Sequence, residues 1–282
     1  MSNSPPIVRT VNELRGITAE WRRDGEASAL VPTMGALHEG HLSLVDLAHE
    51  HADRSVVSIF VNPRQFAPGE DLTSYPRDEA GDLDKLYERD ADLVFIPDKD
   101  AMYPPDFSTT VQVGAVSEGL CGASRPHFFG GVATVVAKLL IQAQCDYAVF
   151  GEKDFQQLLV IRRMARDLNI PTEILGAPIV REDDGLAMSS RNQYLDAQQR
   201  EMAPHLYATL ESIAESIRLG AAVPTALEQG VQVLSQAGFD VDYLELRSSR
   251  TLEPQIEHAE NPTRLFAGTY LGKTRLIDNI EV

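Results

Sequence analysis

The chain has 282 residues, enough for one large domain or two modest ones with a substantial core. Its formal net charge of −17 argues against a general affinity for nucleic acid, because binding to a phosphate backbone requires a basic surface. No stretch approaches the ~20 apolar residues that cross a bilayer, and residues 1–6 lack the pattern of a secretory signal. We therefore expect a cytoplasmic protein that binds neither nucleic acid nor a membrane.

Two further features of the composition bear on function. Cys121 and Cys145 are too few for a disulfide framework or a cysteine metal cluster, so we expect each to be a small buried hydrophobic side chain. The acidic excess has two interpretations, an ordinary solvated acidic surface or adaptation to a salty cytosol, where ions screen the repulsion between like charges.

Apolar runs alternate with helical patterns from residue 28 to about residue 180. The expected strands are Ser28–Val31, Ser55–Val61, Leu93–Ile96, Tyr147–Phe150 and Thr172–Leu175, and the expected helices are His41–His51, Arg77–Arg89, Val132–Gln144 and Phe155–Leu168. This alternation predicts a parallel sheet covered by helices on both faces. Ligands of such sheets bind at the carboxyl ends of the strands, where the strand order reverses.

The pattern changes after about residue 181. Two long helical stretches, Ala197–Ile217 and Thr225–Ala237, precede strands at Val241–Leu246, Thr263–Tyr270 and Thr274–Ile280. The sequence thus predicts an α/β fold: a Rossmann-like doubly wound parallel sheet in residues 1–180, and a smaller C-terminal α+β domain in residues 181–282 that acts as a lid. We expect a hinge at residues 180–185.

The most informative motif is Pro32-Thr33-Met34-Gly35-Ala36-Leu37-His38-Glu39-Gly40-His41, which follows the first expected strand of the sheet. It places His38 and His41 in the first turn of a helix, on one face. Exposed amide groups and the helix dipole favour a phosphate at such a position. Capping or surface histidines remain an alternative. A zinc site is less favoured because the spacing is one residue short of His-Glu-x-x-His, and no Gly-Lys-Ser/Thr of a P-loop is present.

Three other polar segments follow strands or interrupt the apolar pattern. Phe60–Phe66 carries Asn62 and Gln65 after the second strand, where turn residues alone would look the same. Phe150–Gln157 holds Lys153 and Gln157 at a later strand-to-helix junction, where Asp154 could simply cap the helix.

The fourth segment is a polar, glycine-bearing loop, Arg181–Asn192, with two hydroxyl groups and an arginine. Such a loop can wrap a triphosphate and move with it, although a surface hairpin has a similar composition.

Taken together, the four segments resemble the pantothenate synthetase, or pantoate–β-alanine ligase, family of the nucleotidylyltransferase superfamily. The first segment resembles the His-x-Gly-His motif of that superfamily, and Met188-Ser189-Ser190-Arg191 resembles the mobile Lys-Met-Ser-Lys-Ser loop of class I aminoacyl-tRNA synthetases. One departure is clear, since the family usually has Arg-Pro-Gly-His-Phe-x-Gly-Val where this chain has Arg125-Pro126-His127-Phe128-Phe129-Gly130-Gly131-Val132. We therefore leave His127 out of the site.

The resemblance implies a ligase that joins pantoate and β-alanine at the expense of ATP, through pantoyl adenylate, with release of AMP and pyrophosphate. It implies these ATP-binding residues: Met34, Gly35, Ala36, Leu37, His38, Glu39, Gly40, His41, Gly151, Glu152, Lys153, Asp154, Val180, Met188, Ser189, Ser190 and Arg191. The implied catalytic residues among them are His38, His41, Lys153 and Arg191, with His41 as the proton donor. The implied contacts to pantoate and β-alanine are Asn62, Gln65 and Gln157.

The resemblance further implies a homodimer and Mg²⁺ carried mainly by the ATP phosphates, and we assign no protein metal ligands because no carboxylate cage is visible. Two other functions stay open. A different nucleotidylyltransferase resembling a small synthetase would share the histidine motif and the mobile loop, although the acidic balance counts against a tRNA substrate. A non-catalytic nucleotide sensor would bind ATP without releasing pyrophosphate.

Overall fold

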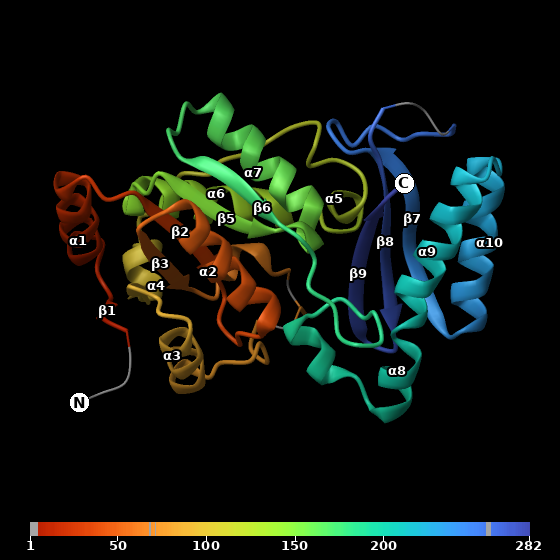
Figure 1. The fold of residues 1–282 in the computed structure, drawn as a ribbon, viewed down its shortest axis with the longest axis horizontal. Helices are drawn as coiled ribbons and strands as arrows, with labels where there is room; N and C mark the ends of the chain where they lie inside the picture. Colours follow the sequence, from red (N-terminus) through yellow and green to blue (C-terminus); the bar gives the residue numbers. More distant parts are fainter. Residues whose placement is uncertain (1–4, 68, 71, 258–260) are drawn as a thin grey trace. The chain divides into compact units, whose positions relative to one another are not determined.

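The computed structural model describes residues 5–67, 69–70, 72–257 and 261–282 (Figure 1). The chain forms two structural units. The first contains the described residues up to 114, together with 125–152 and 157–178, and the second contains residues 115–124 and 153–156 and the described residues from 179 onward. Each unit is built around its own β-sheet.

The first unit contains a six-stranded parallel sheet in the order β1-β4-β3-β2-β5-β6. Its strands are β1 (Ile7–Val8), β2 (Ser28–Thr33), β3 (Arg54–Ile59), β4 (Leu93–Phe95), β5 (Tyr147–Gly151) and β6 (Glu173–Ala177). Its helices are α1 (Val11–Asp24), α2 (Glu39–His51), α3 (Glu79–Glu88), α4 (Lys99–Met102), α6 (Phe128–Ala143) and α7 (Phe155–Asp167), with the 3-10 helix η1 (Pro63–Gln65). The first two residues of α7 belong to the second unit. The expected Rossmann-like parallel sheet is therefore confirmed.

Helices cover both faces of this sheet because successive side chains of its strands point to opposite faces and are apolar on both. Ala29 and Val31 of β2 pack in one apolar cluster with Leu44 and Val45 of α2. Leu30, between them, is also fully buried and points to the opposite face. There α6, which contacts β2, packs against α1.

The N-terminal elements β1 and α1 lie outside the strands and helices that the apolar pattern predicts. A local signal for α1 is nevertheless present. Thr10 and Glu13 form a capping box, and Gly25 ends the helix in a left-handed conformation with φ 81°.

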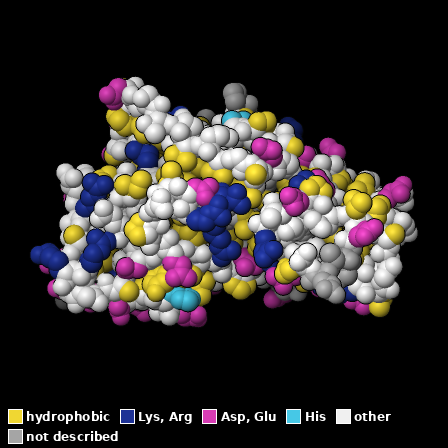
Figure 2. All heavy atoms as spheres, turned by 90° about the horizontal axis from the view of Figure 1, so that it is seen from above, with side chains coloured by type: hydrophobic (Ala, Val, Ile, Leu, Met, Phe, Trp, Pro, Cys, Tyr) yellow, Lys and Arg dark blue, Asp and Glu magenta, His cyan; other side chains and the backbone are white. Residues whose placement is uncertain are grey.

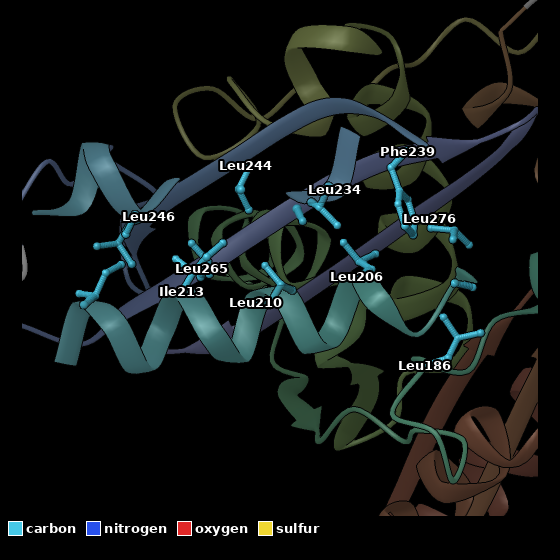
Figure 3. Packing of buried hydrophobic residues seen from close by; sticks show 14 of the residues in the cluster. Leu186, Leu206, Leu210, Ile213, Leu234, Phe239, Leu244, Leu246, Leu265 and Leu276 are labelled. Carbon is cyan, nitrogen blue, oxygen red and sulfur yellow. The ribbon is translucent and has the colours of Figure 1, made fainter. Parts of the chain in front are cut away.

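The second unit contains a three-stranded antiparallel sheet in the order β7-β8-β9. Its strands are β7 (Phe239–Ser248), β8 (Thr263–Leu271) and β9 (Thr274–Glu281). Its helices are α5 (Cys121–Ser124), α8 (Ala197–Met202), α9 (His205–Arg218) and α10 (Val223–Gln236), with the 3-10 helices η2 (Glu152–Asp154) and η3 (Ser190–Tyr194). The first residue of η2, Glu152, still belongs to the first unit. Leu206, Leu210 and Ile213 of α9 point toward the sheet (Figure 3). They meet Leu244 of β7 and Leu265 of β8, so one apolar core lies between the helices and this sheet.

The single helix expected over 197–217 is wrong. The chain instead forms α8 and α9 with a break at Ala203 and Pro204. Proline lacks a backbone N–H and its ring collides with the preceding turn, so a helix restarts at a proline more readily than it continues through one.

Both signs of charge are present on the surface. Figure 2 shows acidic side chains scattered over one face, with lysine and arginine side chains among them. Within the described ranges, no helix combines the length and apolar character needed to cross a membrane. Cys121 and Cys145 are both buried free thiols, as expected.

Candidate functional site

The order of the strands brings three of the predicted segments to one edge of the first sheet. β3, β2 and β5 are consecutive neighbours and run parallel, so their carboxyl ends lie at the same edge. The segments that leave these ends begin at residues 60, 34 and 152. The strand order reverses between β2 and β5, which is where doubly wound sheets bind their ligands.

The loop after β2 is held in an unusual backbone conformation. Gly35 and Ala36 have φ values of 83° and 51°, both in the left-handed region. The carboxylate of Asp82, on α3, accepts the backbone N–H groups of Ala36 at 2.9 Å and Leu37 at 2.7 Å. A β-carbon on Gly35 would lie 2.9 Å from an oxygen of Asp82, so glycine permits this close approach.

Asp82 is a residue that sequence reasoning missed. Its side chain is buried, and this burial raises the pKa of Asp82 above its ordinary value, although the backbone hydrogen bonds from Leu37 and Ala36 act in the opposite direction. On α3, one turn away, Lys85 donates to the backbone oxygen of Leu37 at 2.6 Å. Helix α3 thus holds the loop through the side chains of Asp82 and Lys85.

The two histidines of the loop lie together, as predicted. Their ring centroids are 4.1 Å apart. His38 is the N-cap of α2 rather than part of its first turn, because its Nδ1 accepts the backbone N–H of Gly40 at 3.1 Å. With Nδ1 as the acceptor, a neutral His38 carries its proton on Nε2. His41 lies in the first turn of α2, where backbone N–H groups favour an anion.

The loop after β3 brings Gln65 beside the histidine loop. Gln65 Nε2 lies 3.0 Å from the sulfur of Met34, and Gln65 Oε1 accepts from Asn62 Nδ2 at 3.0 Å. Gln65 is partly exposed, whereas Asn62 is 1% exposed. Arg125 donates to the backbone oxygen of Gln65 at 3.1 Å and forms a bidentate pair with Glu70. Arg125 is a further residue that the motif analysis did not assign.

The segment after β5 contains two adjacent glutamines that differ in burial, Gln156 and Gln157. Gln156 is buried and binds the backbone of residues 116–121: its Nε2 donates to the oxygens of Val116 and Gly119, and its Oε1 accepts from the N–H of Cys121. Gln157 is partly exposed and belongs to the first unit. Of the two, Gln157 is thus the one whose side chain is accessible to a ligand.

Lys153 is partly exposed and lies in η2 with Asp154. The ring of Phe155, which follows, packs in the second unit against Phe266, with the Arg264 guanidinium 4.1 Å from its centroid. These contacts anchor the backbone beside the lysine.

The predicted hydroxyl-bearing loop is a short hairpin within the second unit. Arg181 and Ala187 form an antiparallel bridge, and the N–H of Met188 donates to the oxygen of Val180 at 3.0 Å. Val180 and Met188, both expected at the nucleoside, are therefore neighbours. Arg181 pairs with Asp278 at 2.6 Å and lies over an aromatic ring, so one side of the hairpin is pinned to the unit.

Ser189 and Arg191 lie at the end of this hairpin. The Ser189 hydroxyl accepts the backbone N–H of Arg191 at 3.2 Å and caps η3. Ser189, Ser190 and Arg191 are all partly exposed.

Elsewhere, His127 is exposed at the start of α6 and makes no side-chain capping bond. Across the described part of the chain, no group of three or more His, Cys, Asp or Glu side chains is arranged to hold a metal ion.

A doubly wound parallel sheet with glycine-bearing loops at its switch point is typical of nucleotide-binding α/β proteins. Comparison with known proteins narrows this class. Residues 6–281 match the model of the pantoate-beta-alanine ligase family. The chain belongs to this family, and it is an enzyme of the ligase class.

Individual relatives agree with this assignment over the full length. The chain is 56% identical to a pantothenate synthetase of Rhodospirillum rubrum, over 98% of this chain and 99% of that protein. The crystal structure of pantothenate synthetase from Thermus thermophilus matches with a TM-score of 0.92 at 45% identity, over 98% of this chain and 99% of that one. A pantoate-beta-alanine ligase from Francisella tularensis, complexed with beta-gamma ATP and beta-alanine, matches with a TM-score of 0.82 at 31% identity, over 99% and 98%.

Proposed function

We propose that the chain joins (R)-pantoate to β-alanine in two steps that consume ATP. In the first, a pantoate carboxylate oxygen attacks the α-phosphorus of ATP, the bond to the β-phosphate oxygen breaks, and pantoyl adenylate and pyrophosphate form. In the second, the β-alanine amine attacks the acyl carbon, AMP leaves and the amine loses a proton. The observation that carries this proposal is the convergence of the histidine and Asn62–Gln65 loops on neighbouring strands, β2 and β3, beside the switch point.

The proposed residues supply donors and positive charge rather than a nucleophile, which suits a reaction between two substrates. His38 and His41 contact the ATP phosphates, and His41 donates the proton. Lys153, Ser189, Ser190 and Arg191 neutralise the charge that builds on the phosphates. Gly151, Asp154, Val180 and Met188 border the nucleoside, and the remaining ATP contacts come from residues 34–40 and Glu152.

Gln65 and Gln157 bind pantoate in this proposal, and Gln65 also contacts β-alanine. Gln65 already lies 3.0 Å from Met34 of the ATP-binding loop, which supports adjacent sites for the two substrates. The Francisella tularensis ligase, whose structure is a complex with beta-gamma ATP and beta-alanine, further supports this choice of substrates. We expect Mg²⁺ to enter on the ATP phosphates, the C-terminal domain to act as a lid, and the protein to work as a cytoplasmic homodimer.

A pyrophosphate-release assay tests the proposal. With ATP and pantoate but no β-alanine, we expect a burst of pyrophosphate equal to the enzyme concentration, and with β-alanine, continuous release of AMP. Release that requires tRNA would indicate another nucleotidylyltransferase, and ATP binding without any pantoate-dependent release would indicate a nucleotide sensor. Either outcome overturns the ligase proposal.

A further inference from the structure

We propose that Tyr103 is a positioning residue that holds the Asn62 amide in place, and through Asn62 the Gln65 amide, so that Gln65 presents N–H donors to pantoate. This inference rests on the proposed function, in which Gln65 binds pantoate. Tyr103 follows α4 and is 9% exposed. The Phe107 ring packs against the edge of Tyr103, with 5.1 Å between centroids, and the Arg64 guanidinium lies 5.4 Å from the Tyr103 centroid. The Tyr103 ring is thus held by packing.

The first step concerns the orientation of Asn62. Its Oδ1 lies 2.8 Å from the Tyr103 hydroxyl and 3.3 Å from the backbone nitrogen of Arg64. A backbone N–H can only donate, so the atom of Asn62 at this place must be the oxygen, and the Tyr103 hydroxyl must donate as well. Burial raises the pKa of Tyr103 to about 12, so the hydroxyl keeps its proton at neutral pH.

The second step passes this orientation to Gln65. With its oxygen directed at Tyr103, Asn62 turns its Nδ2 toward the backbone oxygen of Gly131 at 3.2 Å and toward the side chain of Gln65 at 3.0 Å. The Gly131 oxygen can only accept, which independently places the Asn62 nitrogen there. The nearer atom of the Gln65 amide must then be its oxygen, Oε1.

The third step gives the chemistry that Gln65 offers. Its Nε2 faces away from Asn62 and lies 3.0 Å from the sulfur of Met34, a weak acceptor. Carboxylate and hydroxyl oxygens, which pantoate carries, accept hydrogen bonds more strongly than a thioether. If the Gln65 amide were reversed, its oxygen would face the substrate carboxylate, and the two oxygen-bearing groups would repel each other. The chain from Tyr103 to Gln65 therefore selects a ligand with acceptor oxygens.

The test compares Tyr103→Phe with the wild type in steady-state ligation. Tyr103→Phe removes the hydrogen bond from the Tyr103 hydroxyl to Asn62. We expect the KM for pantoate to rise roughly 5- to 10-fold, with kcat and the KM for ATP changed less than about twofold. A structural defect would move all three constants or the thermal midpoint. Tyr87→Phe, an exposed tyrosine of α3, is the control and should leave every constant unchanged.

A double-mutant cycle then asks whether Tyr103 acts through Gln65. In the Gln65→Ala background, Tyr103→Phe should cause no further rise in the KM for pantoate. If Tyr103→Phe leaves the KM unchanged in the wild-type background, or raises it equally in both backgrounds, the inference is wrong. The proposed function is judged separately, because it stands or fails on whether the wild type makes the ligated product at all.

Asn62→Asp provides an independent variant if Tyr103→Phe folds poorly. The aspartate retains acceptors for Tyr103 and Arg64 but sets an oxygen, in place of a donor, against both Gln65 and the Gly131 carbonyl, so the Gln65 amide must reverse. We expect a larger rise in the KM for pantoate than for Tyr103→Phe, again with the KM for ATP nearly constant. An unchanged KM for pantoate in a folded Asn62→Asp protein would also overturn the inference.

Discussion

Asn279 donates a hydrogen bond from its Nδ2 to the backbone oxygen of Lys153, with 3.0 Å between the two atoms. Arg264, on the neighbouring strand β8, donates to Asn279 Oδ1 at 2.6 Å and so fixes which end of the amide faces Lys153. The backbone of a proposed phosphate-binding lysine is therefore tied to strand β9 by a side chain that none of the four motifs contains.

This contact predicts a specific defect in Asn279→Asp. The carboxylate would still accept from Arg264, but it would place an oxygen against the Lys153 carbonyl. We expect adenylate formation to slow by about 10-fold, the equivalent of one hydrogen bond. Single-turnover pyrophosphate release measures this step, with Lys273→Ala, an exposed lysine of the β8–β9 turn, as the control. A wild-type rate in Asn279→Asp would show that the contact does not position Lys153.

His41→Ala and Lys153→Ala test the charge-stabilising roles directly. Removal of one donor to a transition state typically costs ~10²- to 10³-fold in rate, and we expect losses of that size in adenylate formation. Both side chains are partly exposed, so the far-UV circular dichroism and Tm should stay near wild type. His205→Ala, an exposed histidine of α9, should retain full activity. Near-wild-type single-turnover rates would refute the assigned roles.

The adjacent glutamines should separate binding from stability. Gln157→Ala should raise the KM for pantoate while ATP binding and Tm stay unchanged. Gln156→Ala removes a buried amide that binds four backbone groups of residues 116–121, so we expect a loss of about 2 kcal/mol in the free energy of unfolding. Urea unfolding and substrate titration of both variants measure the difference. The reverse pattern would exchange the two roles.

Gly131→Ala should disturb the Gln65 loop by direct contact with its backbone. A β-carbon at Gly131 would overlap the backbone carbonyl of Arg64 and lie 2.8 Å from the backbone nitrogen of Gln65. We expect about 1–3 kcal/mol of destabilisation together with a raised KM for pantoate. Gly130→Ala is the matched control, since its β-carbon would meet only the end of the Gln112 side chain, which can move. Equal behaviour of the two variants would contradict this account.

Glu70 predicts an acid-sensitive contribution to stability. Burial opposes its ionisation, but the hydrogen bonds from Arg125 and the Ala67 N–H, with the charges of Arg125 and His127, outweigh burial and hold the pKa of Glu70 below its ordinary value of 4.5. A lowered pKa gives stability that is complete above pH 4.5 and is lost as the pH falls through the folded-state pKa.

Urea unfolding of the wild type and Glu70→Gln measures this contribution. Because the pair is partly solvated, we expect a difference of about 1 kcal/mol at pH 7 that shrinks below pH 4.5. A difference that grows on acidification would show that the Arg125 pair does not favour the ionised form of Glu70.

Local signals in the sequence predicted much of the fold. The apolar runs placed β2 to β6, and the histidine spacing predicted that His38 and His41 lie together, although His38 caps α2 and is not in its first turn. Two predictions failed although the sequence carries a local signal for each. The helix α1 was missed although Thr10 and Glu13 form a capping box, and one helix was expected over 197–217 although Pro204 interrupts the pattern. These signals were present but carry less weight than apolar periodicity over a long window.

The supporting residues of the site could not be predicted in this way. Asp82 lies 46 residues beyond Ala36, and Tyr103 lies 41 residues beyond Asn62. Their contacts depend on which strands become neighbours and on the helix that returns between them, and neither follows from the periodicity of a single segment. Asp82 and Tyr103 also look ordinary in the sequence, because an acidic residue on a helix and a tyrosine after one are usually surface or core residues.

The adjacency of β2 and β5 also constrains the order in which the molecule assembles. Ala29 pairs with Tyr147, so more than a hundred residues must be synthesised before the two strands can meet, and the closure of so long a loop is slow. During translation the histidine loop leaves the ribosome well before the strand that completes its surroundings. A nascent chain truncated before residue 147 would thus carry the complete histidine motif beside an exposed, unpaired strand, a state that is prone to aggregation and a natural target for chaperones.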